Sequence, residues 1–327
     1  MAFSVMRFDL RAPAFSPAAH ADLYPAALDI ARYADENGWD AAVVCEHHAV
    51  DDGFLPSPIP MLAALAGRTR ELRLTASALL LPLYDPVKLA EDLAVLDLVS
   101  GGRCRLTVGM GYRPDEYAMF GKGWDTRGKL MDECLEVLCR AWLGEPFDWN
   151  GRRVHMTTRP ITLPKPPIMC GGTLKVGARR AARFGLPFAP SVNTPAVIEE
   201  YLVECERLGV ADPVVLAPGS GEWIWCSNDP DRTWAQIGKY LLHDVLSYAS
   251  WQRPGEESAV YSPARDIDEL RAEGRYRILT PDECVARAKE LGEKADFAHF
   301  PLCGGTPPDL AWESIELFTN EVIPRIS

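Results

Sequence analysis

The stretch Trp39-Asp-Ala-Ala-Val-Val-Cys-Glu-His-His48 decides the fold. Its apolar part, residues 41–45, is too short for a helix and rich in valine, which is typical of a strand buried in a parallel sheet. Glu46, His47 and His48 follow directly, at the carboxyl end of that strand. In parallel α/β folds this end of the sheet is where ligands bind. A single histidine could equally cap the strand or bond nearby backbone, but the triplet favours a functional site.

Strand-like and helix-like segments alternate on both sides of this stretch. Including it, the pattern predicts eight strands, each followed by helical sequence, over residues 1–10, 41–45, 72–81, 103–108, 166–171, 188–191, 223–226 and 297–302. Eight such units in this length favour a (β/α)8 barrel, an α/β TIM barrel, as a single domain over residues 1–327, rather than a doubly wound sheet. Residues 112–124 and 251–278 exceed what a bare barrel needs. We expect the second region to be an insertion, either a lid or a surface loop without function.

Composition excludes several classes of function. The net charge is −12 and Lys and Arg form no cluster, which argues against nucleic-acid and membrane-surface binding. No apolar run approaches the ~18 residues of a membrane span, and residues 1–10 alternate like a strand, unlike a signal peptide. Nine cysteines are scattered without a Cys-x-x-Cys pair, which suits a reducing cytoplasm rather than a disulfide scaffold or zinc site.

Two glycine-containing turns are weak signals by themselves. Gly171-Gly172-Thr173 stands between a predicted strand and a helix, where backbone N–H groups and the helix amino end could bind a phosphate. Gly-Gly alone favours a simple tight turn. Gly109-Met-Gly111 follows another predicted strand, and glycine there suits a flat ring lying against backbone. The six histidines form no metal-binding motif and no nucleophile elbow occurs, so we expect no metal and no serine or cysteine nucleophile.

An ordered series of short motifs, taken together, resembles the bacterial luciferase-like flavin-dependent monooxygenase family. The resemblance runs from residue 5 to the end of the chain, apart from 251–278. The motifs are Glu46-His47-His48, Leu81-Pro82, Asp85-Pro86-Val87, Ala90-Glu91-Asp92, Leu96-Asp97, Ser100-Gly101-Gly102-Arg103, Phe120-Gly121, Gly171-Gly172-Thr173, Ala181-Ala182-Arg183 and Pro301-Leu302-Cys303-Gly304-Gly305. Only this resemblance identifies the cofactor as a flavin.

The resemblance implies a set of site residues. His47 matches the family's active-site histidine, whose ordinary pKa of ~6.5 suits proton transfer. The resemblance implies that Arg127 adds a positive charge near the flavin phosphate, although the match to the family has a one-residue gap close to this position. It implies that Ser77, Ala78 and Gly109 lie under the flavin ring. The residues that it implies around the phosphate are Gly171, Gly172, Thr173, Leu174 and Gly177. The family commonly has a non-proline cis peptide, which would fall at Ser77–Ala78. Glu46, His48, Tyr112 and Trp223 are candidates for the substrate pocket, although such aromatic residues are more often buried core.

Two positions depart from the luciferases themselves. Gly109 stands where they have a cysteine beside the flavin, which argues against light emission. Thr173 and Leu174 replace a glutamate and a serine in the phosphate turn.

The resemblance implies a monooxygenase that uses reduced FMN from a separate flavin reductase, together with O2, to oxidise a small organic substrate. It also implies a homodimer. Two alternatives remain open. Coenzyme F420 could carry hydride with no oxygen activated, although Glu-His-His tilts the expectation toward FMN. The chain could instead be a flavin-binding barrel without catalysis.

Overall fold

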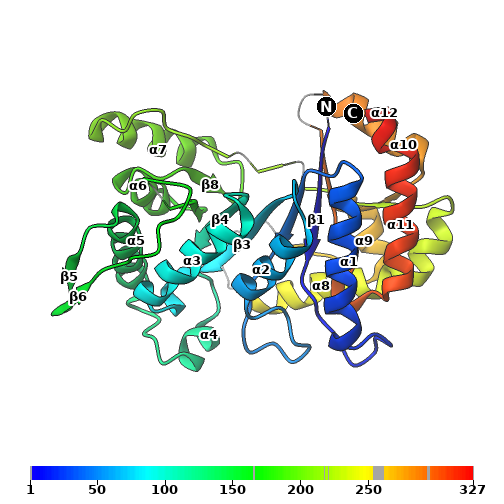
Figure 1. Cartoon of the computed structure of the whole chain (residues 1–327). Helices are drawn as coiled ribbons and strands as arrows, with labels where there is room; N and C mark the ends of the chain where they lie inside the picture. Colours follow the sequence, from blue (N-terminus) through cyan, green and yellow to red (C-terminus); the bar gives the residue numbers. More distant parts are fainter. Residues whose placement is uncertain are drawn as a thin grey trace. The chain divides into compact units, whose positions relative to one another are not determined.

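The computed structural model describes residues 2–164, 166–216, 218–219, 221–252, 261–292 and 295–326. The chain forms two compact units, one of residues 1–56, 68–73 and 219–327 (unit 1) and one of residues 57–67 and 74–218 (unit 2). Parallel strands accompanied by helices build both units (Figure 1).

Unit 1 contains five parallel strands in the order β10-β9-β11-β1-β2. Met6 and Phe8 of β1 are fully buried, whereas Val5 and Arg7 on the alternate face are part-exposed. Its elements are β1 (Phe3–Phe8), α1 (His20–Glu36), β2 (Ala41–Val44), β9 (Trp223–Cys226), α8 (Pro230–Trp251), α9 (Ile267–Glu273), β10 (Tyr276–Leu279), α10 (Pro281–Leu291), β11 (Asp296–His299), the 3-10 turn η3 (Cys303–Gly305), α11 (Pro308–Glu321) and α12 (Ile323–Ile326).

Unit 2 contains four parallel strands in the order β3-β4-β7-β8 and a separate antiparallel pair, β5-β6. Its elements are α2 (Pro58–Arg68), β3 (Arg73–Leu80), the 3-10 turn η1 (Leu81–Leu83), α3 (Pro86–Ser100), β4 (Cys104–Gly109), α4 (Pro114–Met119), α5 (Arg127–Leu143), β5 (Phe147–Trp149), β6 (Arg152–Val154), β7 (Ile168–Gly172), α6 (Lys175–Arg183), β8 (Phe188–Pro190) and α7 (Pro195–Leu208).

Local sequence explains where α3 begins and ends. The carboxylate of Asp85 accepts hydrogen bonds from the amides of Val87 and Lys88, each 3.0 Å long. Pro86 occupies the first turn, where no amide partner is needed. The helix ends at Gly101, whose φ of 63° is in the left-handed region that glycine adopts without steric cost.

Each strand predicted from the sequence has a counterpart within a few residues, and the described residues contain three further strands, β5, β6 and β10. The third of these, β10, bears on the expected insertion. It lies at the end of the 251–278 range and pairs in parallel with β9, Tyr276 opposite Trp223. That range also contains α9, while residues 253–260 lie outside the described residues. Residues 267–278 therefore belong to the regular structure, and the expectation of a lid in this range stays a prediction.

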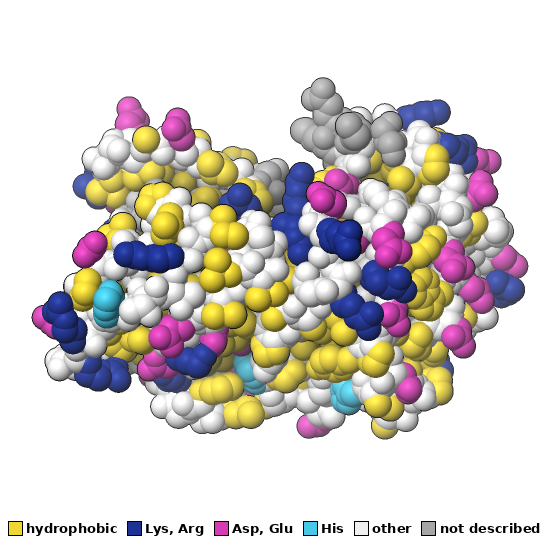
Figure 2. Space-filling model, viewed as in Figure 1, with side chains coloured by type: hydrophobic (Ala, Val, Ile, Leu, Met, Phe, Trp, Pro, Cys, Tyr) yellow, Lys and Arg dark blue, Asp and Glu magenta, His cyan; other side chains and the backbone are white. Residues whose placement is uncertain are grey.

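On the face drawn in Figure 2, positively and negatively charged side chains lie intermingled over α1 and α11. No helix in the described part of the chain is both long and apolar enough to cross a membrane. All nine cysteines are free thiols, and all but Cys139 are buried.

Candidate active site

His47 lies just past the end of β2 in unit 1, and its side chain is almost enclosed by aromatic rings. The ring centroids of Phe54, Trp251 and Tyr248 are 4.8, 4.9 and 5.7 Å from that of the imidazole. His47 is only 6% exposed. Tyr248 and Trp251 both come from the last turn of α8, so this helix supplies much of the enclosure.

Glu46 and His48 bind each other. The His48 Nε2 atom is 2.9 Å from Glu46 Oε1, and both side chains are buried. Of the three polar residues at this strand end, His47 is thus the one surrounded by rings, whereas His48 has a carboxylate partner. Both residues stay candidates for the site, and they differ in their surroundings.

A buried ionic cluster, centred on Arg11, follows β1 in the same unit. Its guanidinium lies 2.6 Å from Asp52 Oδ2 and 3.2 Å from Asp244 Oδ1, and Arg11 is fully buried. His243 Nε2 is also 2.6 Å from Asp52 Oδ2. Burying a charge is costly unless it is paired, and here two carboxylates neutralise one arginine. The sequence signal that could have revealed it is Asp9-Leu-Arg11, charged residues directly after a strand.

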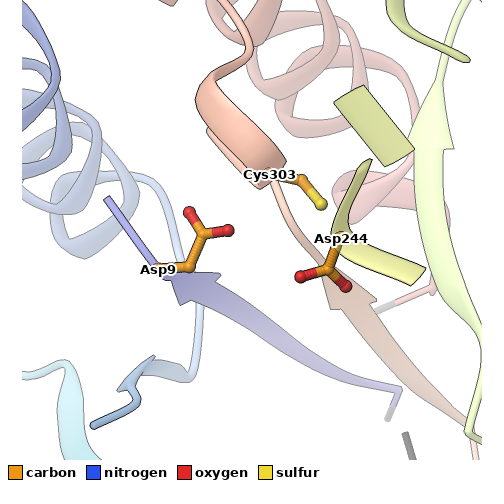
Figure 3. A group of neighbouring side chains, drawn as sticks. All are labelled: Asp9, Asp244 and Cys303. Atoms are coloured by element: carbon orange, nitrogen blue, oxygen red, sulfur yellow. The ribbon is translucent and has the colours of Figure 1, made fainter. Parts of the chain in front are cut away.

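Asp9, Asp244 and Cys303 face one another at the edge of this cluster (Figure 3). Their ligand atoms lie within 4.8 Å of one another, a spacing that a metal ion could bridge. However, Asp9 Oδ2 accepts from the amide of Gly304 at 3.0 Å, and Asp244 accepts from Arg11 and from the Tyr276 hydroxyl. Burial raises the pKa of Asp9 to about 7 and raises that of the Cys303 thiol. The two carboxylates therefore already accept hydrogen bonds from the protein, and Asp244 is paired with Arg11.

Arg7, on β1, lies in a second, different environment in unit 1. Its Nε donates to Cys45 Sγ at 2.8 Å and its Nη2 to the Tyr248 hydroxyl at 2.9 Å. The guanidinium lies over the rings of Trp223 and Phe300, 5.2 and 5.1 Å from their centroids. Trp223, a candidate for the substrate pocket, therefore contacts a cation. Nothing in the sequence motifs singled out Arg7.

In unit 2, the turn between β7 and α6 holds the residues expected at a phosphate. Gly172 has a φ of 155°, and Thr173 is part-exposed and Leu174 exposed. Within the described part of the chain, no side chain caps the start of α6 at Leu174. The Gly177 amide donates to the Leu174 carbonyl at 2.9 Å, so the amides of Lys175 and Val176 are those at the open helix end. Such an end favours an anion.

Small residues also mark the neighbouring strand ends of unit 2. The Ser77–Ala78 peptide bond is cis, which confirms the prediction made for this bond. A Cβ placed on Gly109 would lie 3.2 Å from the Ala78 Cβ, and one on Gly171 would lie 3.0 Å from the Thr107 Cγ2. β3, β4 and β7 are consecutive in the sheet, so their ends form one edge with very short side chains, which we call the small-residue edge (Ala78, Gly109, Gly171 and Gly172).

Arg127 and Tyr112 complete the predicted set. The Arg127 guanidinium lies 4.0 Å from the centroid of the Trp124 ring and donates to the Trp124 carbonyl at 3.0 Å. Tyr112 is part-exposed in the bend after β4. The structure thus gathers Glu46, His47, His48 and Trp223 in unit 1, and the remaining predicted residues, Ser77, Ala78, Gly109, Tyr112, Arg127, Gly171, Gly172, Thr173, Leu174 and Gly177, in unit 2.

A family model described as luciferase-like monooxygenase matches residues 6–294. Limonene 1,2-monooxygenase from Rhodococcus erythropolis is 25% identical over 321 residues, 92% of this chain and 81% of that protein. The oxygenase component of a flavin-dependent trigonelline monooxygenase from Acinetobacter baylyi is 29% identical over 153 residues, 45% of this chain and 42% of that protein. Against the first curated relatives that it matches, the chain spans about half of their length.

Solved structures give the same picture over the whole chain. The monooxygenase RslO1 from Streptomyces bottropensis has a TM-score of 0.77 and 26% identity, with all of both chains covered. The oxygenating constituent of 3,6-diketocamphane monooxygenase from Pseudomonas putida, in complex with FMN, has a TM-score of 0.74 and 19% identity, covering 100% of this chain and 99% of that chain. An F420-dependent secondary alcohol dehydrogenase has a TM-score of 0.69 and 18% identity, with the same coverage. The α/β fold of luciferase-like TIM-barrel proteins, predicted from the sequence, is confirmed.

Proposed function

We propose, from the premise that this chain belongs to the luciferase-like monooxygenase family, that it is a flavin-dependent monooxygenase. It would use reduced FMN, supplied by a separate flavin reductase, and O2 to oxidise a small organic substrate. The trigonelline relative is named an oxygenase component, which supports a separate reductase. One structural observation carries the proposal, namely the small-residue edge beside an uncapped helix end in unit 2.

The residues at this edge fit a flat ring with a phosphate tail. Added Cβ atoms at Gly109 and Gly171 would come within 3.2 and 3.0 Å of neighbouring side chains. Glycine at these two positions therefore leaves the backbone accessible to a flat ring. The turn from Gly172 to Leu174 leads into α6, whose first amides can bind a phosphate. Arg127, at the start of α5 in the same unit, would add positive charge. A bound ring on the edge and a bound phosphate at the turn use adjacent strand ends.

Reduced FMN, when bound, supplies the electrons for oxygen activation. The protein's own residues contribute binding, exclusion of water and proton transfer. Phe54, Tyr248 and Trp251 surround His47 with apolar rings, and such surroundings exclude water from a reactive site. A ring nitrogen of His47 would give a proton to, or take one from, the substrate oxygen.

Coenzyme F420 is the second candidate cofactor, because one structural neighbour is named as F420-dependent. In that case the chain would transfer hydride and would not consume O2. Anaerobic titration of the full chain with reduced FMN and with reduced F420 tests the two. We expect saturable binding of reduced FMN and weaker binding of F420, and the reverse order would replace the proposed cofactor.

The small-residue edge is tested by Gly109→Ala. The added methyl group would take up space where the flavin ring would lie, so we expect the affinity for reduced FMN to fall about tenfold, about 1.4 kcal/mol. Gly67→Ala is the matched control, because an added Cβ there meets nothing within 4 Å. Equal affinities in the two variants would contradict binding of the ring at this edge. Binding without O2 uptake over a broad substrate panel would indicate a barrel that binds flavin and does not catalyse.

We further propose that the protein is a cytoplasmic homodimer. Free, mostly buried thiols suit a reducing compartment. The helix α3 of unit 2 leaves Val95, Leu98 and Val99 about half exposed, on one side of the helix by their spacing. A second copy covering this side would remove apolar surface from water.

A further inference from the structure

Two arginines of unit 1 reach the same helix, α8, but have different partners. Arg11 contacts Asp52 and Asp244, so two carboxylates surround its charge. Arg7 bonds to a thiol and a phenol. Among the described residues, no carboxylate oxygen lies within ion-pair distance of Arg7. Carboxylates therefore neutralise Arg11 by direct contact, whereas Asp244 and Asp9 act on Arg7 only at longer range.

The hydrogen bonds that Arg7 makes with described residues use one edge of its guanidinium. A guanidinium has five N–H donors in a fixed plane. Cys45 and Tyr248 take Nε and one hydrogen of Nη2, which lie along the same edge of that plane. Among the described residues, no acceptor binds either hydrogen of Nη1 or the second hydrogen of Nη2. One N–H of Nη1 and one N–H of Nη2 point away from the rest of the side chain in parallel. A carboxylate can accept a hydrogen bond from each of them, one with each oxygen.

The rings around the Arg7 guanidinium are apolar, and the residue is part-exposed. Arg7 lies on the part-exposed face of β1, opposite Val43 of β2, which is also part-exposed. The rings of Trp223 and Phe300 lie beside the guanidinium and hold its plane in place. A ligand bound to the free side would meet a charge for its anionic group and apolar surface for its carbon skeleton.

Tyr248 links this position to the candidate catalytic histidine. Its hydroxyl accepts from Arg7 Nη2 at 2.9 Å, and its ring centroid is 5.7 Å from that of His47. One side chain thus separates the two residues. An anion held at Arg7 would place the adjoining part of the same molecule near the imidazole.

We propose that Arg7 binds a carboxylate of the substrate, so that the substrate is an organic acid with an apolar body. This rests on the proposed monooxygenase function for the meaning of "substrate", but the binding itself does not need turnover. Arg7 is then the residue that selects acids over neutral compounds of the same shape. A purely structural arginine would not distinguish an acid from its amide.

The test is calorimetric titration of the purified full chain, with and without oxidised FMN, using benzoate and hexanoate and their neutral amides. We expect each acid to bind more tightly than its amide by about 10- to 100-fold, the usual worth of charge-assisted hydrogen bonds. Arg7→Gln should abolish this preference, and Arg7→Lys should keep part of it. Arg73→Gln is the matched control, since that exposed arginine also lies over a ring, that of Phe3, and it should change nothing.

Equal binding of acids and amides by the wild-type chain, or no binding of any of the four, would overturn the proposal. A preference that survives Arg7→Gln would do so as well. The wild-type comparison decides the matter even if Arg7→Gln does not fold. FMN affinity is measured in parallel and should be unchanged in Arg7→Gln; a loss would assign Arg7 to the cofactor instead. An acid preference without any FMN binding would refute the proposed function and leave the carboxylate site standing.

Discussion

At the residue scale, replacing His47 should separate cofactor binding from turnover. His47→Ala removes the ring nitrogen while Phe54 and Trp251 remain around the position. General acid–base catalysis typically contributes about 10²- to 10⁴-fold, so turnover should fall by that factor while the affinity for reduced FMN stays within about twofold. Single-turnover product formation and FMN titration measure the two quantities.

His155→Ala serves as the control, because His155 is exposed in unit 2 and should affect neither quantity. Turnover of His47→Ala equal to that of wild type would remove His47 from the mechanism. Loss of FMN binding and turnover together would instead make it a structural residue.

His299 should make folding stability depend on pH. It is buried on β11 against Trp39 and Phe318, its ring nitrogens have no hydrogen-bond partner among the described residues, and burial lowers its pKa to about 3. In the unfolded chain the His299 imidazole has a pKa near 6.5, so as the pH falls it takes up a proton before the buried imidazole of the folded protein does. The contribution is thus full above about pH 6.5 and is lost progressively toward pH 3, by about 2 kcal/mol at pH 5.

His299→Leu removes this titration. The difference in unfolding free energy between pH 7 and pH 5, measured with urea, should therefore be about 2 kcal/mol smaller in the variant than in wild type. His155→Leu, at an exposed position, should leave the difference unchanged. An identical pH dependence in wild type and His299→Leu would show that the buried imidazole is not kept neutral.

Sequence reasoning reached those residues whose position along a strand reveals them. His47 follows a recognisable buried strand, and the cis bond at Ser77–Ala78 was expected from family resemblance. Arg7 and the Arg11 cluster were missed because their partners, Cys45, Asp52 and residues of α8, are distant in sequence. Pairing of this kind depends on the fold and leaves no local pattern.

At the element scale, the regular strands and helices were predictable and the short ones were not. β10 reads Tyr-Arg-Ile-Leu after a charged helix, too short and too mixed to be distinguished from a loop. The β5-β6 pair has only three residues in each strand, and Asn150-Gly151 forms its turn. These elements depend on pairing with a neighbour more than on their own composition.

Replacing the buried residue Asp97 on α3 should lower the unfolding free energy strongly. Its carboxylate is buried and accepts hydrogen bonds from the amides of Ile161 and Thr162 and from the Thr162 hydroxyl, 2.5 to 3.0 Å long. Asp97→Ala leaves these donors unsatisfied, which should lower the unfolding free energy by about 3 kcal/mol.

Asp92→Ala on the same helix is the control for chemical denaturation. Among the described residues, Asp92 pairs only with Lys88, and both side chains are exposed. Such pairs contribute about 0.5 kcal/mol or less. Similar losses in the two variants would contradict a specific role for the Asp97 carboxylate in tying residues 161–162 to α3.

At the scale of the whole molecule, the alternation of strands and helices predicted the fold class, whereas the two compact units were not foreseen. Each unit draws on segments separated in sequence, and composition does not change where the chain passes from one unit to the other. The alternation of strands and helices equally does not predict whether two copies of the chain associate. This association depends on which apolar side chains remain outside the core.

The last prediction tests whether the proposed homodimer forms through α3. Half-exposed Val95, Leu98 and Val99 follow the spacing of one helix side, and in a two-fold dimer each substitution acts on both copies. Val99→Lys would place a charge in apolar surroundings on each side, so sedimentation velocity should show a dimer for wild type and a monomer for the variant. Val203, on α7, is exposed to a similar degree, and Val203→Lys should stay dimeric. A dimer that survives Val99→Lys but not Val203→Lys would move the interface from α3 to α7, because burial of a lysine charge disfavours association only where the partner covers it.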